Sequence, residues 1–576
     1  MNVYRWKIFV CLMCAVSLTD QRTVPLAQAD EPPRLVHRWE IEPDLGIVWL
    51  TPPTRPAVKL HPEKFASEQL QVVLDEAQLA ILHAGSEQLE GRQAALKAML
   101  QRLRTDMDNR QVRLALAGAA IALADASHAS ALWQELGHDT STRPLIERAL
   151  LGWKRPQAHE LWRSRLQDES ATLHDLHLAA SGIGALGAEQ DAPALENLLR
   201  SDGLPIPTKI VVARALGQVM DHGLEKLASD VLDTQLEHRE LLAAELLSHH
   251  TSPQASQVLQ AVLDSEHQPA RLAAYTAISR NYPERARALA EQMLSQSDNN
   301  LRAQAVSVLD KSDDVESLRL QSQRIGDKNY EVRNAVRSNL LRKAQRAELK
   351  PVVDEIIGEI IGEIIYEQLS GEEYRAIEQA ILLSVALDDT QWCPAYLKLL
   401  DFPRPETSLL AAWALQELAH TPQHMQAVLQ HVQTITERLQ GGERVDLPEQ
   451  LRQSFLLEAL GRNRYQPALE TLKLYIPKQH TMGDLCRTSA IWAIGKIVQD
   501  SQDQPLAAAL AERMLDESLI DPEDLLVQYA STVALGWIKA PGSLEQVNKL
   551  RPKGNQPLIK AAEWSVEQLA PSSDSR

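Results

Sequence analysis

The chain has 576 residues, and 44% of them are apolar, which is ample material for a buried core. Only 4% are aromatic, and alanine and leucine, both strong helix formers, supply much of the apolar fraction. The formal net charge of −18 disfavours nucleic acid and anionic membrane surfaces as partners, although a helical array can still carry a local basic groove. The composition therefore favours an acidic, all-α protein.

Residues 1–29 have the pattern of a secretory signal peptide. Arg5 and Lys7 supply the positive region, and the apolar run at 8–19 is too short to span a bilayer of about 30 Å as a helix. Ala27-Gln28-Ala29 then offers a small-x-small cleavage site. We expect an exported protein, periplasmic or extracellular, with no transmembrane segment in the mature chain. The alternative is an uncleaved membrane anchor.

Residues 30–62 form a proline-rich arm or linker. Seven prolines punctuate this segment, and proline disfavours helix at its own position and at the one before it. Between the prolines, residues 34–39 and 46–50 are expected to form short extended pieces. The arm is expected either to pack across the first repeats or to act as a linker.

From residue 63 the pattern becomes helical, and a repeat emerges. Five basic residues recur at intervals of 30, 32, 31 and 31, and an apolar residue follows each of them at offsets +3 and +7, which mark one face of an α-helix. These residues are Lys209, Arg239, Arg271, Arg302 and Arg333. Each interval has room for a second helix and two turns, so residues 63–345 are expected to stack antiparallel helix pairs into an α-solenoid.

Three runs in the chain resemble HEAT and HEAT-like repeats, at 298–305, 327–336 and 484–495. The tripeptide Ala-Leu-Gly is similar to the short repeats of the phycobilisome-lyase type, and it recurs at 185–187, 215–217, 459–461 and 534–536. The resemblance covers 63–345 and 451–569. It implies a fold but no particular function, because proteins of this family bind many partners.

The resemblance also implies a structural ladder of acidic and basic residues beside the core. The matching pairs are Asp298 with Arg302, Asp327 with Arg333, and Asp484 with Arg487. The competing interpretation is that the basic residues from Lys209 to Arg333 face the groove and hold an anionic ligand.

The remaining segments are less regular. Residues 346–450 depart from the period, and we expect longer helices and loops there; 451–569 hold the C-terminal repeats, and 570–576 are a disordered tail. Cys393 and Cys486 lie two or three repeats apart, roughly 20–30 Å in a stack. A disulfide requires Cα atoms within about 7 Å, so both are expected to be buried free thiols.

Four tryptophans are the strongest candidates for a binding surface. Trp413, Trp492, Trp537 and Trp564 fall on predicted second helices of the C-terminal repeats, and tryptophan is enriched in binding hot spots. The competing interpretation, which we favour, is that they are large core residues beside alanine-rich neighbours.

Other motifs match functional patterns only in part. Glu355, Glu359, Glu363 and Glu367 form one helical stripe, which suits a solvated face or a docking stripe for a basic partner better than a metal site. Histidine pairs at 174/177 and 420/424 allow metal binding but have no evident further ligand. Residues 182–187 match the dinucleotide fingerprint, but inside a predicted helix, where it indicates close helix packing.

The sequence therefore predicts an exported HEAT-like scaffold that binds a protein or peptide partner on its concave face. No catalytic residue, metal ligand, cofactor or nucleic-acid partner is expected. One alternative is an α/α-toroid enzyme acting on polysaccharide. Another is a cofactor- or pigment-handling protein, by analogy with the phycobilisome-type repeats.

Overall fold

The computed structural model describes residues 38–42, 47–51, 96–97, 99–104, 110–366, 374–550 and 556–570. Nearly all of these residues lie in helices or in the turns between them. The predicted signal peptide at 1–29, most of the arm at 30–62 and the tail after residue 570 lie outside the described residues.

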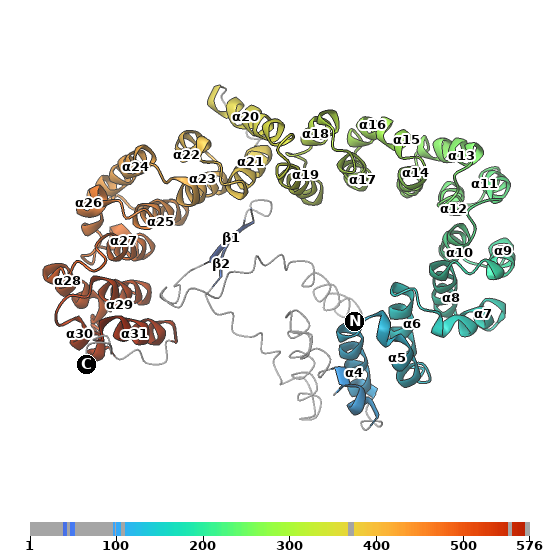
Figure 1. Ribbon diagram of the computed structural model, residues 1–576, viewed down its shortest axis with the longest axis horizontal. Coiled ribbons are helices and arrows are strands. Elements are labelled where there is room, and N and C mark those ends of the chain that lie inside the picture. Colours follow the sequence, from blue (N-terminus) through green and yellow to red (C-terminus); the bar gives the residue numbers. More distant parts are fainter. Residues whose placement is uncertain are drawn as a thin grey trace. The chain divides into compact units, whose positions relative to one another are not determined.

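The helices form antiparallel pairs, and the second helix of each pair packs against the second helix of the next pair. This arrangement is the predicted all-α solenoid (Figure 1). The chain divides into two compact units. We call Pro56–Leu387 the N-terminal array, and Asp388–Arg576 with Met1–Arg55 the C-terminal array. The division falls within 346–450, which the sequence analysis treated as one irregular segment.

In the N-terminal array, the first helices of the pairs form the outer row and the second helices form the inner row (Figure 1). The outer row contains α5 (Ala129–Leu136), α7 (His159–Gln167), α9 (Ala192–Arg200), α11 (Glu225–Leu232), α13 (Pro253–Leu263), α15 (Pro283–Ala288), α16 (Ala290–Leu294), α18 (Val315–Ser322) and α20 (Lys350–Tyr366). The inner row contains α4 (Arg110–Leu123), α6 (Arg143–Gly152), α8 (Leu173–Leu186), α10 (Ile206–Val219), α12 (Arg239–Leu246), α14 (Gln268–Asn281), α17 (Asn299–Asp310), α19 (Tyr330–Lys343) and α21 (Tyr374–Ala386).

The C-terminal array repeats this two-row arrangement. Its outer row contains α22 (Cys393–Leu399), α24 (Pro422–Gln440), α26 (Leu469–Lys473), α28 (Gln504–Met514) and α30 (Ser543–Lys549). Its inner row contains α23 (Pro405–Leu418), α25 (Leu447–Arg462), α27 (Asp484–Ile497), α29 (Leu525–Ile538) and α31 (Gln556–Leu569).

Two strands lie in the arm. β1 (Arg38–Glu42) pairs antiparallel with β2 (Ile47–Thr51), with Arg38 opposite Thr51 and Glu42 opposite Ile47. The two extended pieces expected at 34–39 and 46–50 overlap these paired strands, while residues 34–37 and 46 lie outside the described residues.

Polar caps explain where many helices begin. Asp298 accepts a hydrogen bond from the Asn300 amide at the start of α17, and Asn329 accepts one from the Val332 amide at the start of α19. Asp446 and Asp503 cap α25 and α28 in the same way. Such caps satisfy amides that have no partner inside the helix, so the turn residues between repeats fix the helix starts.

The Ala-Leu-Gly tripeptides mark places where neighbouring inner helices approach closely. A Cβ atom on Gly217 would lie 2.2 Å from the Glu245 carbonyl oxygen of α12, and one on Gly461 would lie 2.5 Å from the Ala493 Cα of α27. Gly187 instead ends α8 in the left-handed conformation, at φ 63°. The dinucleotide-like run at 182–187 is therefore a helix end with close packing, as predicted.

Cys393 and Cys486 are both buried free thiols, the state that their separation predicts. Burial raises the pKa of each thiol to about 12. Within the described part of the chain, none of the helices combines the length and the apolar character needed to cross a bilayer.

Candidate functional site

Three of the four candidate tryptophans form a row across the last inner helices. The rings of Trp492, Trp537 and Trp564 meet edge to face, with centroids 5.8 Å apart in each step. Trp537 is 4% exposed and Trp564 is 7% exposed. These two tryptophans fill the interior of the stack, as the core interpretation predicts.

Glycines make room for this row. A Cβ on Gly461 would lie 3.0 Å from Trp492 Cζ3, and one on Gly495 would lie 2.7 Å from Trp537 Cε3. A Cβ on Gly536 would lie 2.8 Å from Trp564 Cζ3. Each ring thus occupies the space that a glycine of the preceding repeat leaves open, which is a packing role.

Trp413 and Trp492 are the two candidate tryptophans whose side chains remain partly exposed to solvent. Both are half-buried, and they belong to α23 and α27, with α25 between these helices in the stack. The Lys496 Nζ atom lies 5.7 Å from the Trp492 ring centroid and 4.6 Å from that of Trp537, so a cation already covers part of this face.

The arginines of the basic ladder form hydrogen bonds to the backbone of the segment that precedes their own helix. Arg239 donates to the Thr234 carbonyl, Arg271 to Leu263, and Arg333 to Asp327 and Lys328. Lys209 is buried on α10. The three arginines satisfy carbonyls at the ends of the first helices and in the following turns, which is a structural role.

One member of this ladder pairs with an acidic residue of the following repeat. The Arg302 guanidinium donates to both carboxylate oxygens of Asp327 at 2.7 Å, whereas Asp298 caps α17. The expected pairings of Asp298 with Arg302 and of Asp327 with Arg333 are therefore replaced by one pairing across repeats. Burial acts to raise the pKa of Asp327, but the hydrogen bonds from Arg302 and the Asn329 amide, together with the charges of Arg302 and Arg324, outweigh burial and hold that pKa below its usual value.

Arg487 follows the same rule. Its guanidinium donates to both Glu523 oxygens, at 2.7 and 2.8 Å, and to the carbonyls of Tyr475 and Ile476. Asp484, its expected partner, is exposed and also pairs with Arg487, at the longer distance of 3.5 Å. Sequence reasoning missed Glu523, although its place just before the start of an inner helix resembles that of Asp327.

The glutamate stripe partly contacts the neighbouring outer helix. Arg319 of α18 forms ion pairs with Glu355 and Glu359 of α20, at 2.5 and 3.4 Å. The Glu363 side chain and Glu367 lie outside the described residues. For the histidines, the His177 ring bonds Thr208 Oγ1 at 2.8 Å. Within the described ranges, no three His, Cys, Asp or Glu side chains come together in a geometry suited to a metal ion.

The solvent-facing side of the inner row in the N-terminal array has side chains in register. Five consecutive inner helices, α10, α12, α14, α17 and α19, carry positions i and i+4 along this side, and position i+8 falls in the last turn or just after the helix. The equivalent positions recur every 31 residues, so they form three columns across the helices.

The three columns differ in chemistry, and together we call them the register surface. The first column is half-buried and mostly apolar: Ile210, Leu241, Leu272, Ala303 and Asn334. The second is mostly polar: Arg214, Glu245, Thr276, Ser307 and Ser338. The third is polar at Gln218 and His249 and basic at Arg280, Lys311 and Arg342, and it lies at or just beyond the C-terminal ends of the helices.

Local contacts hold parts of the register surface in place. Arg214 pairs with Glu245, and Arg280 donates to the Ser248 carbonyl and contacts His249 Nε2 at 3.1 Å. Arg342 pairs with Asp310. Positive side chains at helix C-termini are also favoured by the helix dipole. The sequence analysis missed this surface because it followed the core-facing offsets of the repeat.

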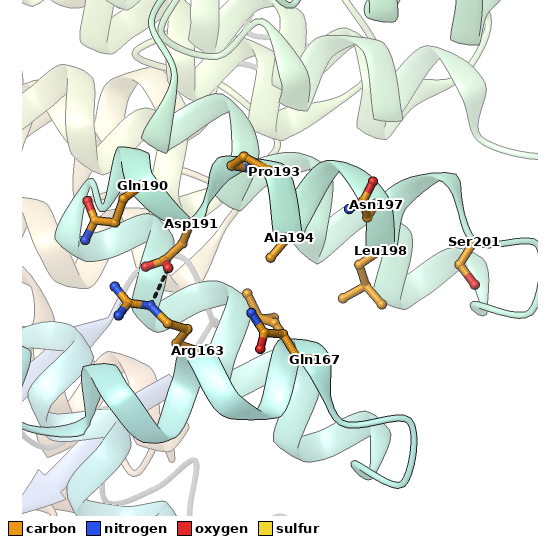
Figure 2. A pocket seen from close by; sticks show the side chains of 10 residues that line it. Arg163, Gln167, Gln190, Asp191, Pro193, Ala194, Asn197, Leu198 and Ser201 are labelled. Carbon is orange, nitrogen blue, oxygen red and sulfur yellow. Dashed lines mark hydrogen bonds and ion pairs between the residues drawn. The ribbon is translucent and has the colours of Figure 1, made fainter.

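Grooves open between neighbouring helices of the outer row. The groove between α7 and α9 has a volume of about 710 Å³ (Figure 2). At one end, the Asp191 carboxylate accepts from Arg163 Nε at 2.7 Å and contacts His159 Nε2 at 2.6 Å. Because these partners already engage the carboxylate, it serves to join α7 to the start of α9.

No protein-family model matches the chain, and no curated protein matches it either. Among solved structures, importin beta in an ammonium sulfate condition is 12% identical, with a TM-score of 0.43 over 87% of this chain and 72% of that chain. Kap95p with RanGDP is 14% identical, with a TM-score of 0.45 over 86% of this chain and 72% of that one. An engineered protein is 15% identical, with a TM-score of 0.30 over 66% and 98%. These likenesses are too distant to inform function.

Proposed function

We propose that the protein is an exported scaffold that holds a segment of a protein partner across the register surface of the N-terminal array. The observation that supports this proposal most directly is the recurrence of a half-buried column and a polar column on five consecutive inner helices, beside a third column that ends in Arg280, Lys311 and Arg342. A surface with similar chemistry at successive repeats suits a partner that runs along the array, because each repeat adds a comparable set of contacts.

The chemistry of the columns defines the kind of segment that fits. The half-buried Ile210, Leu241 and Leu272 take apolar side chains, and the exposed Arg280 and Lys311 take carboxylates. Neighbouring helices in a stack lie about 8–10 Å apart, and an extended chain advances about 3.3 Å per residue. The partner segment is therefore extended, with apolar and acidic positions that recur about every three residues.

Export belongs to the same proposal and rests on the sequence of residues 1–29. The positive region, the short apolar run and the Ala27-Gln28-Ala29 site together have the order of a cleaved signal. The intact mass of the protein purified from the native cell tests this point, since cleavage after Ala29 gives a chain that begins at Asp30. Full-length chain retained in the cytoplasm would contradict it.

The binding test compares two double variants with the same change in charge. Arg280→Glu/Lys311→Glu reverses two exposed positions of the register surface, and Arg200→Glu/Lys226→Glu reverses two exposed positions on the outer helices α9 and α11. Each protein is used as bait in the exported fraction of the native cell, and the captured partner is identified and titrated. Circular dichroism checks that both variants keep their helicity.

The expected result is capture by the unmodified protein and by the outer variant, with affinity falling as salt rises, and loss in the register variant. Equal binding by both variants would place the partner elsewhere. Failure to capture any protein at any salt concentration would count against the scaffold itself.

A further inference from the structure

The loop between α28 and α29 exposes an apolar pair that the fold does not use. Leu519 is 103% exposed and Ile520 is 97% exposed, and Leu525, at the start of α29, is 53% exposed. Single exposed aliphatic residues are ordinary, but neighbouring ones on one loop mark an interaction site more often than a random surface does. We call residues 516–525 the apolar tip.

The tip is held by hydrogen bonds on both sides of the exposed pair. The Asp516 carbonyl accepts from the Glu523 amide at 3.0 Å and from Gln528 Nε2 at 3.2 Å, which closes the loop. Lys478 reaches the Asp516 and Asp521 carboxylates at 3.5 and 3.1 Å. Because its ends are fixed in this way, the tip loses little conformational freedom when a partner binds.

A groove begins beside the tip. It lies between α28 and α30, has a volume of about 940 Å³, and is lined by Asp516, Ser518 and Asp521 on the side of the tip. The small side chains of Ala507, Ala508 and Ala511 line it along α28. A segment that covers the exposed pair can therefore continue into a groove of sufficient depth for side chains.

The charged residues around the tip indicate which charge a partner segment should carry. Glu512, Glu517 and Asp521 are exposed. The nearby cations are already paired, Arg513 with Glu512 and Glu523, and Lys478 with Asp516 and Asp521. The same ion pairs also engage Glu512 and Asp521, but carboxylates outnumber cations around the apolar centre, which favours a basic partner and disfavours an anionic membrane.

We propose that the apolar tip and the α28–α30 groove dock an amphipathic, basic segment of a protein partner. Its apolar face covers Leu519 and Ile520, and its lysines or arginines face Glu512, Glu517 and Asp521. This site adds a second surface to the proposed scaffold. The tip is acidic whereas the register surface carries basic side chains, so we expect the two surfaces to bind different segments.

The test measures the binding of defined labelled peptides to the purified full chain by fluorescence anisotropy. The probe peptide carries Lys and Leu at helical spacing; one control peptide has Glu in place of Lys, and another has Ser in place of Leu. The apolar variant is Leu519→Ser/Ile520→Ser, matched by Leu447→Ser/Leu474→Ser, which changes two other exposed leucines of the same array. The charge variant is Glu512→Lys/Glu517→Lys, matched by Glu437→Lys/Glu470→Lys at other exposed glutamates.

The expected result is binding of the Lys/Leu peptide alone, weakened at least about tenfold by the apolar variant and by the charge variant, and unchanged in the two matched controls. Equal binding by the apolar variant and its control would overturn the proposal. So would equal binding of the Glu/Leu peptide.

Two further measurements exclude other occupants of the tip. Flotation with neutral phosphatidylcholine vesicles tests for a lipid surface, and light scattering tests for self-association. Either signal, if present in the unmodified chain and lost in Leu519→Ser/Ile520→Ser, would overturn the proposal. Peptide binding that depends on the tip but survives Arg280→Glu/Lys311→Glu would support it even if no partner is captured on the register surface.

Discussion

At the residue scale, the buried charges are committed to joining one repeat to the next. Arg487 is almost fully buried, and its guanidinium faces a Glu523 carboxylate that is also buried. Burial acts to raise the pKa of Glu523, but the hydrogen bonds and charge of Arg487, with smaller effects of the Asp524 amide and Arg513, together lower that pKa. Such a pair specifies which helices pack together. Removing one partner destabilises the fold by more than the intact pair stabilises it, because a buried charge is left without its counterion.

Replacing one member of this pair is therefore expected to open the end of the C-terminal array. Arg487→Met leaves Glu523 buried with Arg513 at 3.4 Å as its remaining cation, and should cost about 3 to 5 kcal/mol. Hydrogen exchange of α27 and α29 measures this loss. The double variant Arg487→Met/Glu523→Leu should recover most of it, since no uncompensated charge remains; a double variant as unstable as the single one would contradict this account.

A second buried group makes the stability of the N-terminal array depend on pH. His250 is fully buried, and its Nε2 accepts from the Leu224 amide at the start of α11. Burial lowers its pKa below the ordinary value of about 6.5, although Glu225 and Asp221 act in the opposite direction. The unfolded chain therefore binds this proton first as the pH falls, so stability present above about pH 6.5 is lost on the way to pH 5.

His250→Gln is expected to reduce this loss, because the glutamine oxygen still accepts from Leu224 but does not titrate. The measurement compares urea midpoints at about pH 7 and pH 5. Some dependence should remain, since burial also lowers the pKa of His177 and His249 in the same array. His138→Gln, at an exposed position, is the control. If His250→Gln loses as much of its urea midpoint between about pH 7 and pH 5 as the unmodified protein does, His250 is not a source of the acid sensitivity.

At the element scale, the close approach of inner helices depends on particular glycines. Gly217 of α10 faces backbone carbonyl oxygens of α12, whereas a Cβ on Gly118 of α4 would meet no atom of another described element within 4 Å. Alanine is favoured over glycine in a helix by about 1 kcal/mol when nothing else changes. An alanine substitution at Gly118 therefore reports the effect of helix propensity, whereas one at Gly217 also reports the effect of packing between two helices.

Gly118→Ala is expected to stabilise the array by up to about 1 kcal/mol, and Gly217→Ala to destabilise it by about 1 to 3 kcal/mol as α10 and α12 move apart. Urea unfolding followed by circular dichroism measures both changes. Stabilisation by both substitutions would mean that the α10–α12 contact yields at little cost.

The periodic part of this architecture could be predicted from sequence, because the core-facing positions repeat about every 31 residues. The ladder from Lys209 to Arg333 correctly located five inner helices. The partners of that ladder could not be predicted, since the distance from Arg302 to Asp327 depends on how one pair stacks on the next. The burial of Trp537 and the exposure of Leu519 likewise depend on contacts between repeats, which a single helical pattern does not contain.

At the scale of the whole molecule, each repeat packs mainly against its neighbours in the chain. In such an array, stability is approximately a sum of repeat terms and nearest-neighbour terms, so unfolding need not be all-or-none. A substitution should then act over the few repeats around it. This locality is also what allows the register surface and the apolar tip to change independently.

The prediction is that Gly217→Ala speeds hydrogen exchange in α8 to α14 and leaves α25 to α29 unchanged, whereas Arg487→Met does the reverse. Mass spectrometry of peptic fragments measures both patterns, with Gly118→Ala as the control that should slow exchange near α4. A chain that unfolds as one unit would instead show equal acceleration in every helix when exchange is limited by global opening. In that case a partner bound at one array would stabilise the other, and the two proposed surfaces would be thermodynamically coupled.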